Sequence, residues 1–207
     1  WSTAEAESRC LLDAVREASA GVPFETLILC GGSKGGANAL AAAIQWSVSH
    51  AELLDEAREE AVPCREMLVV TFGAPNIVGR GSGKPETVRA LHQLHSVLQK
   101  KAPKSRAWSF SQDPVPALMS ARSRQVISQY HKGSPYAMGA LRRFMPQAYK
   151  KVNKYLKEAV RVTATFQPVL PEAWLDPPPG VRGSRFQASV HPQRNYTEAL
   201  CRRLLNC

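Results

Sequence analysis

Three short apolar runs are separated along the chain, and each is followed by a turn-forming stretch that contains glycine or proline. They extend from Phe24 to Cys30, from Glu66 to Phe72 and from Ser105 to Phe110. Apolar runs of this length between turn signals are typical of buried strands, so we predict a strand at each. The length of 207 residues suits one α/β domain, and we expect residues 1–207 to form a single domain with a mostly parallel sheet flanked by helices.

Elsewhere, apolar residues recur at the three- and four-residue spacing of amphipathic helices. Helices are predicted from Glu5 to Ala18, Ala37 to Val48, Ser49 to Ala61, Pro85 to Lys101, Pro146 to Val162 and Asn195 to Leu205. Two other stretches carry turn signals instead. Tyr130 to Tyr136 is predicted to form turns, and Pro168 to Gly183, rich in proline and glycine, is predicted to form an extended loop.

The first predicted strand ends at Gly31-Gly32-Ser33-Lys34-Gly35, which matches the pattern G-x-S-x-G. Between a strand and a helix this pattern forms a tight turn with an exposed serine at its apex, the nucleophile elbow of hydrolases. We expect Ser33 to adopt a strained backbone angle, and Gly31 and Gly35 to allow strand and helix to approach closely. The backbone N–H of Lys34, at the helix N-terminus, would then face an oxyanion.

Glycine-rich turns between strand and helix also bind phosphate groups in other proteins. The P-loop requires Gly-Lys followed by Ser or Thr, whereas here Lys34 follows Ser33. The dinucleotide-binding pattern G-x-G-x-x-G is not met in register either. The two common phosphate-binding patterns are thus not met, but the turn by itself does not establish a nucleophile, and later stretches of the chain favour one.

Candidates for the other groups of a serine hydrolase come later in the chain. Asp113 follows the third predicted strand and precedes Pro114, which keeps it out of the helical conformation. Functional side chains gather at this end of α/β sheets, although an Asp-Pro pair is also common in surface turns. His131 and His191 are the candidate bases. His131 is nearer to Asp113 in sequence, and His191 precedes a short C-terminal helix.

Composition narrows the classes of partner. The chain has 207 residues, 44% of them hydrophobic, and a net charge of +10, which favours anionic partners such as acidic lipid surfaces or nucleic acid. We expect no nucleic acid, because the sequence has no zinc-finger spacing, aromatic platform motif or basic recognition helix. The five cysteines form no C-x-x-C pair, and His92 and His95 have no third ligand nearby, so we expect neither a metal nor a cofactor.

The chain has no apolar run long enough to span a bilayer, and no signal-peptide pattern begins at Trp1. Because it does not start with methionine, we expect a fragment or a processed form. The sequence does not specify a compartment.

Four stretches resemble the class 3 (fungal-type) lipases of the α/β-hydrolase fold. They are LILCGGSKGGANALAAA, MLVVTFGAPNIVG, WSFSQDPVPAL and SVHPQRNYTEAL. They are similar to the family's elbow and alanine-rich helix, its next strand with an F-G-x-P turn, the strand that bears its acid, and its terminal histidine before a tyrosine-bearing helix. The order Ser, Asp, His is also that of α/β-hydrolases. The chain departs from the family beside the serine, where Gly32 and Lys34 replace the usual His and Leu.

The resemblance implies that the chain hydrolyses carboxylic esters of lipids, acylglycerols or phospholipids, through Ser33, His191 and Asp113. It favours His191 over His131 as the base, oriented by Asp113, with the Lys34 N–H holding the oxyanion. The family's lid and first oxyanion donor lie upstream of the elbow, where this chain has only 32 residues, so we expect both to be missing from it. The alternative function is a catalytically inactive lipase-like module that binds lipid surfaces or protein partners.

The predicted helix from Pro146 to Val162 has an apolar stripe and a lysine-rich face. We expect the stripe to pack on the domain and the lysines to be solvated. The alternative is that the basic face binds an anionic membrane surface, which would bring the elbow to a lipid substrate.

Overall fold

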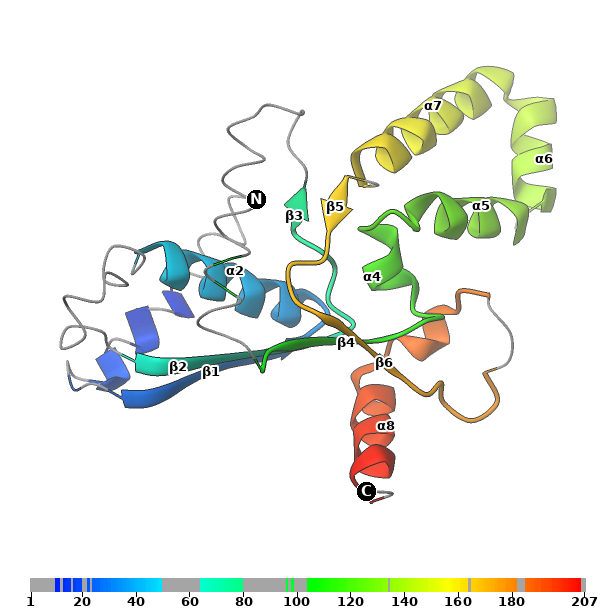
Figure 1. Cartoon of the computed structure of the whole chain (residues 1–207). Helices are drawn as coiled ribbons and strands as arrows, with labels where there is room; N and C mark the ends of the chain where they lie inside the picture. Colours follow the sequence, from blue (N-terminus) through cyan, green and yellow to red (C-terminus); the bar gives the residue numbers. More distant parts are fainter. Residues whose placement is uncertain are drawn as a thin grey trace. The chain divides into compact units, whose positions relative to one another are not determined.

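A computed structural model of the chain (Figure 1) describes residues 10–11, 13–15, 17–19, 22, 24–49, 64–79, 96, 98, 104–133, 135–163, 165–181 and 185–205. The chain divides into two compact units, and we describe each by itself. The first contains the described residues up to 74, with 96, 98, 104–109 and 169–174. The second contains residues 75–79 and the described residues among 110–168 and 175–205.

The first unit is built on a sheet whose strands lie in the order β1 (Phe24–Gly32), β2 (Cys64–Phe72), β4 (Arg106–Phe110) and β6 (Glu172–Leu175). β1 pairs with β2, and β2 with β4, in parallel. Helix α2 (Lys34–Ser49) connects β1 to the rest of the unit and packs on β1 and β2 (Figure 1). The predicted mixed α/β fold, with a parallel sheet flanked by helices, is therefore confirmed.

The core of this unit lies between α2 and one face of the sheet. Leu27 of β1 pairs with Met67 of β2, and Leu29 with Val69, and all four are buried. Helix α2 contributes the facing buried side chains, which are Ala39, Leu40, Ala42, Ala43 and Trp46. The opposite face is more open, since the side chain of Ile28 is 61% exposed. The run from Phe24 to Cys30 was predicted to be a buried strand, and β1 is buried on one face only.

The second unit is mainly helical. Its helices are α4 (Pro114–Leu118), α5 (Ser123–Gly133), α6 (Pro135–Phe144), α7 (Pro146–Thr163), the 3₁₀ helix η3 (Ala188–Val190) and α8 (Gln193–Leu205). Two short strands, β3 (Val78–Gly79) and β5 (Phe166–Gln167), pair antiparallel. Helices α5, α6 and α7 follow one another with short connections (Figure 1).

Two stretches predicted to be irregular contain regular structure. Tyr130 to Tyr136 was expected to form turns, but it contains the end of α5 and the start of α6. Gly133 is the last residue of α5 and Pro135 the first of α6, which are positions that suit glycine and proline at helix ends. The stretch from Pro168 to Gly183 contains β6, which joins the sheet at its edge, where flanking prolines are tolerated.

The other helix predictions have mixed outcomes. The described residues between 10 and 19 are helical, and α2, α7 and α8 agree with the predicted helices to within three residues at each end. The predicted helices from Ser49 to Ala61 and from Pro85 to Lys101, with His92 and His95, lie almost entirely outside the described residues. Within the described ranges, no helix has the length and apolar character needed to cross a membrane.

Helix α7 does not bury its apolar stripe as predicted. None of its residues is fully buried. One side, formed by Tyr149, Asn153, Leu156 and Val160, is half-buried. Other apolar residues of the helix are exposed, with Tyr155 at 74% and Val162 at 49%. The stripe therefore packs in part only, and the rest of it faces solvent.

Candidate active site

Ser33 occupies a strained position between β1 and α2. Its φ of 51° is the only positive φ of a non-glycine residue in the described ranges. An L-residue in this left-handed region is disfavoured by about 1–2 kcal/mol. The N–H of Ser33 donates to the carbonyl of Phe72 at the end of β2 (2.8 Å), and the Ser33 carbonyl accepts from the N–H of Ala37 in α2 (3.2 Å). These bonds hold the turn in place, and the strained angle predicted for Ser33 is confirmed.

The glycines of the turn have different roles. A Cβ on Gly31 would lie 2.4 Å from the backbone carbon and oxygen of Gly35, so Gly31 is required, as predicted. A Cβ on Gly35 would meet nothing within 4 Å, so the prediction that Gly35 is needed for close approach is wrong. Gly36 is needed instead, because a Cβ there would lie 2.7 Å from the Ala74 Cβ and from the Gly31 carbonyl oxygen.

Lys34 is the first residue of α2, directly after Ser33, and its side chain is exposed. The first N–H groups of a helix lack acceptors within the helix, and the helix dipole makes this end partly positive. Both effects favour an anion beside Ser33. Since Lys34 brings its own charge to the same end, the turn is suited to stabilising a developing oxyanion.

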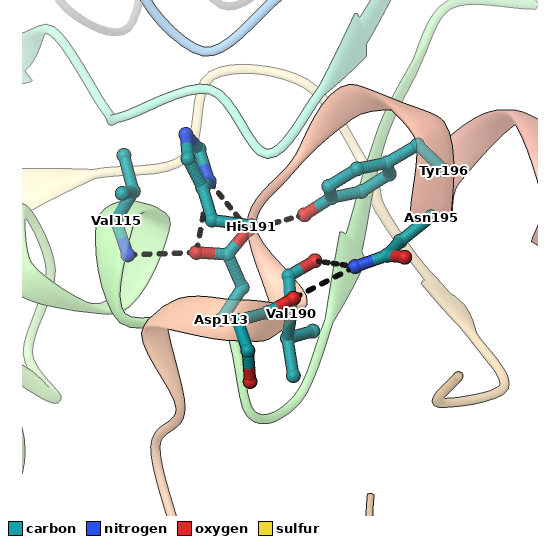
Figure 2. A network of polar contacts seen from close by, with 7 residues as sticks. Asp113, Val115, Val190, His191, Asn195 and Tyr196 are labelled. Atoms are coloured by element: carbon teal, nitrogen blue, oxygen red, sulfur yellow. Dashed lines mark hydrogen bonds and ion pairs between the residues drawn. The ribbon is translucent and has the colours of Figure 1, made fainter. Parts of the chain in front are cut away.

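Asp113 lies at the end of β4 and is completely buried. It is the N-cap of α4, where its Oδ1 accepts a hydrogen bond from the N–H of Val115 (2.8 Å). Its Oδ2 accepts from the hydroxyl of Tyr196 in α8 (2.5 Å). Nδ1 of His191 lies 2.8 Å from Oδ2 and 3.1 Å from Oδ1 (Figure 2). The structure thus brings Asp113 together with His191, which is 78 residues away in sequence.

The contact with Asp113 determines which nitrogen of His191 carries a proton. A carboxylate can only accept hydrogen bonds, so Nδ1 donates to it and carries the proton. In the neutral imidazole, Nε2 then carries the lone pair. The His191 side chain is 23% exposed, whereas that of Asp113 is fully buried. This arrangement orients an imidazole so that Nε2 can act as a base.

Side chains from two helices position the backbone around His191, which caps η3. Asn195 of α8 donates through Nδ2 to the carbonyls of Ser189 (2.8 Å) and Val190 (3.1 Å) (Figure 2). Gln129 of α5 binds the Phe186 backbone twice, donating to its carbonyl (2.6 Å) and accepting from its N–H (2.8 Å). The segment from Phe186 to Val190, just before His191, is therefore bound by α5 at its start and by α8 at its end.

Sequence reasoning missed three of these residues, Tyr196, Asn195 and Gln129. Tyr196 carried a signal, since it lies on the apolar face of a predicted helix and a buried tyrosine hydroxyl needs a partner. Asn195, at the predicted start of that helix, was interpreted only as its beginning. Gln129 gave no signal, because a glutamine on a polar helix face is normally solvated.

The site residues predicted from sequence belong to different units. Ser33 and Lys34 are in the first, and Asp113 and His191 are in the second. His131, the competing base, lies in α5, and its side chain is outside the described part of the structure. Among the side chains described, no three of His, Cys, Asp and Glu are grouped so that they could hold a metal ion.

Comparison with known proteins gives no match. No protein family, no curated protein and no solved structure matches the chain.

Proposed function

We propose that this protein is a serine hydrolase that cleaves carboxylic esters of lipids, with Ser33 as nucleophile, His191 as general base and Asp113 as the group that orients His191. The observation that carries the proposal is the buried Asp113 carboxylate hydrogen-bonded to His191 Nδ1. This arrangement provides a base with a fixed tautomer and a partner that stabilises its protonated form.

In the proposed reaction, the Ser33 Oγ attacks the ester carbonyl carbon while Nε2 of His191 takes the hydroxyl proton. The carbonyl oxygen becomes an oxyanion, stabilised by the Lys34 N–H at the start of α2. The C–O bond to the alcohol then breaks, and His191 returns the proton to the departing alkoxide. Water, deprotonated by His191, hydrolyses the acyl-Ser33 ester and regenerates the hydroxyl.

One further observation supports a role for Ser33. Ser33 retains a disfavoured φ of 51°, although a glycine would adopt that angle at no cost. Strain of this kind is concentrated at functional sites. The lipid substrate itself rests on the resemblance to class 3 lipases carried by the four stretches quoted above. Ser33 lies in the first unit, and Asp113 and His191 lie in the second. The proposal therefore includes the statement that these residues act in one site.

The test is labelling with a fluorophosphonate, which reacts only with an activated serine, together with turnover of a short p-nitrophenyl ester. We expect wild-type protein to label and to hydrolyse the ester, and Ser33→Ala to lose both, with turnover falling by about 10⁴-fold or more. Ser111→Ala is the control, because it makes the same change at an exposed serine that lies two residues before Asp113. A folded Ser33→Ala protein that keeps its turnover would rule out Ser33 as nucleophile.

The same experiment distinguishes the alternative function. A wild-type protein that is folded but neither labels nor turns over ester would be a non-catalytic module. The fold would then serve to bind a lipid surface or a protein partner, and Asp113 and His191 would be a structural pair.

A further inference from the structure

Helix α7 has a stripe of exposed apolar side chains that the rest of its unit does not cover. The stripe consists of Val152, Tyr155, Ala159 and Val162, at helical spacing. Val152 is 37% exposed, Tyr155 74% and Val162 49%. The half-buried side of the helix lies elsewhere, and α7 packs on α5 and α6. The exposed stripe is therefore available to a partner.

The stripe continues past the start of α7. Phe144, the last residue of α6, is 74% exposed, and Met145, between the two helices, is 58% exposed. The Arg143 guanidinium lies 5.5 Å from the centre of the Phe144 ring, so a cation accompanies the apolar side chain here too. Large exposed apolar side chains that form a row are a common mark of an interaction surface.

A row of cations runs along the whole helix, on the other flank of its exposed side from the apolar stripe. Lys150, Lys154, Lys157 and Arg161 form a second row at helical spacing, and Lys151 lies between the two rows. All five side chains are exposed. The four cations of the second row line a shallow groove of about 410 Å³ along α7, together with Tyr149, Asn153 and Glu158. The groove gives phosphate groups a place between several cations.

The positive charge of the chain is concentrated in this region. Between Pro114 and Pro171 the sequence has ten lysines and arginines and a single acid, Glu158. Arg161 binds that carboxylate at 2.6 Å, and this hydrogen bond holds the pKa of Glu158 below its usual value. The one acid is therefore paired with Arg161, and with ten cationic residues and one acid the region has a net charge of +9.

We infer that α7, with the end of α6, is a docking site for the surface of an anionic lipid bilayer. A helix with an apolar row beside a cationic row can lie in the plane of the interface, its apolar side chains among the acyl chains and its lysines on the headgroups. Nucleic acid or an acidic peptide would satisfy the cations but would leave Tyr155 and Val162 exposed. A bilayer satisfies both rows, and this argument does not depend on the hydrolase proposal.

The first test removes charge from the outward side of the helix. Binding of the full chain to phosphatidylcholine vesicles with and without phosphatidylserine is measured for wild type and for Lys151→Glu/Lys154→Glu. We expect wild type to bind only the anionic vesicles, more tightly at low salt, and the double variant to lose about 25-fold or more in affinity, since each lysine contributes about fivefold. The control Arg185→Glu/Arg194→Glu makes the same charge change at exposed residues elsewhere, and it should bind like wild type.

The second test removes the apolar row and leaves every charge in place. Tyr155→Ser/Val162→Ser should lose at least tenfold in affinity for anionic vesicles, whereas a short RNA duplex should not distinguish this variant from wild type. Equal vesicle binding by this variant and wild type would overturn the proposal, because it would show that any polyanion suffices. Circular dichroism checks that each variant folds. Lys151→Gln/Lys154→Gln replaces the charge-reversal variant should that one fail to fold.

Measuring ester turnover alongside vesicle binding tests the docking site and the serine hydrolase independently. The α7 variants should hydrolyse a soluble p-nitrophenyl ester at the wild-type rate. A wild type without turnover that still binds anionic vesicles would support the docking site and contradict the hydrolase. Turnover without binding to anionic vesicles would do the reverse.

Discussion

Asp113 shows how a carboxylate can be completely buried in this protein. Burying an unpaired charge is costly, but both oxygens of Asp113 accept hydrogen bonds from the backbone of Val115, the hydroxyl of Tyr196 and the ring of His191. One donor lies two residues after Asp113, and the other two belong to the segment from His191 to Tyr196. The carboxylate therefore connects α4 to that segment, which also fixes the His191 ring.

Removal of one donor should destabilise the protein. Tyr196→Phe deletes only the hydroxyl that donates to Oδ2 of Asp113 and leaves the ring, which packs 4.4 Å from that of Phe110 between centroids. A buried acceptor that loses a charge-assisted bond costs about 1.5–3 kcal/mol, so the urea midpoint should fall accordingly. Tyr155→Phe is the matched control, because Tyr155 is 74% exposed, and its effect should stay within about 0.5 kcal/mol. Equal midpoints for the two variants would contradict the role of the Tyr196 hydroxyl.

At this scale, sequence reasoning found residues whose local pattern is unusual and missed those defined by distant partners. Asp113 was found because a proline follows it directly after an apolar run, and Ser33 because glycines flank it. The Tyr196 hydroxyl was missed because its acceptor is 83 residues away. A tyrosine on an apolar helix face is compatible with core packing alone, so only the fold reveals the bond.

Among the elements, the turn between β1 and α2 depends most on single residues. The strand and the helix meet so closely that Gly31 has no room for a Cβ. Gly35, the second residue of α2, has open space around it. The pattern G-x-S-x-G treats the two glycines alike, whereas the packing does not.

This difference can be tested with one added methyl group at each site. Gly31→Ala should cost at least about 1–3 kcal/mol, because its Cβ would overlap backbone atoms of Gly35 and Gly36 that cannot move away without displacing α2. Gly35→Ala should be neutral or stabilise by about 0.4–1 kcal/mol, since it restricts the unfolded chain and lies inside a helix. Chemical denaturation of the two variants measures both effects. If Gly35→Ala proved the more damaging of the two, the turn would not have the described backbone.

The elements themselves were predictable where pattern and length agreed. β1, β2 and β4 begin and end within two residues of the predicted strands. The boundary of α5 and α6 was missed because Tyr130 to Tyr136 was predicted to form turns, although Gly133 and Pro135 also suit helix ends, and no helix was predicted over the rest of either. The open face beside Ile28 could not be predicted, because an apolar run gives no information about which face of a strand is covered.

Over the whole molecule, the prediction of a single domain stays a prediction, since the two units are described each by itself. The two units nevertheless differ in charge and in secondary structure. The stretch with almost all the excess positive charge lies in the predominantly helical part of the chain, and the serine turn lies in the parallel sheet. The proposed surface binding by α7 and the proposed chemistry at Ser33 thus belong to separate regions of the sequence, so variants should affect one without the other.

The proposed reaction requires that Ser33 respond to a change in the other unit. Asp113→Asn keeps the shape of the side chain but removes the charge that holds the tautomer of His191, and a comparable change in a known triad lowers turnover by about 10⁴-fold. We therefore expect fluorophosphonate labelling of Ser33 and ester turnover to fall by several orders of magnitude in Asp113→Asn and in His191→Gln. Asp176→Asn makes the same change at an exposed carboxylate and should leave both rates unaltered. Thermal unfolding distinguishes a lost base from a lost fold. If folded His191→Gln labelled as fast as wild type, another base, such as His131, would activate Ser33, and the Asp113–His191 pair would serve only to join η3 and α8 to the end of β4.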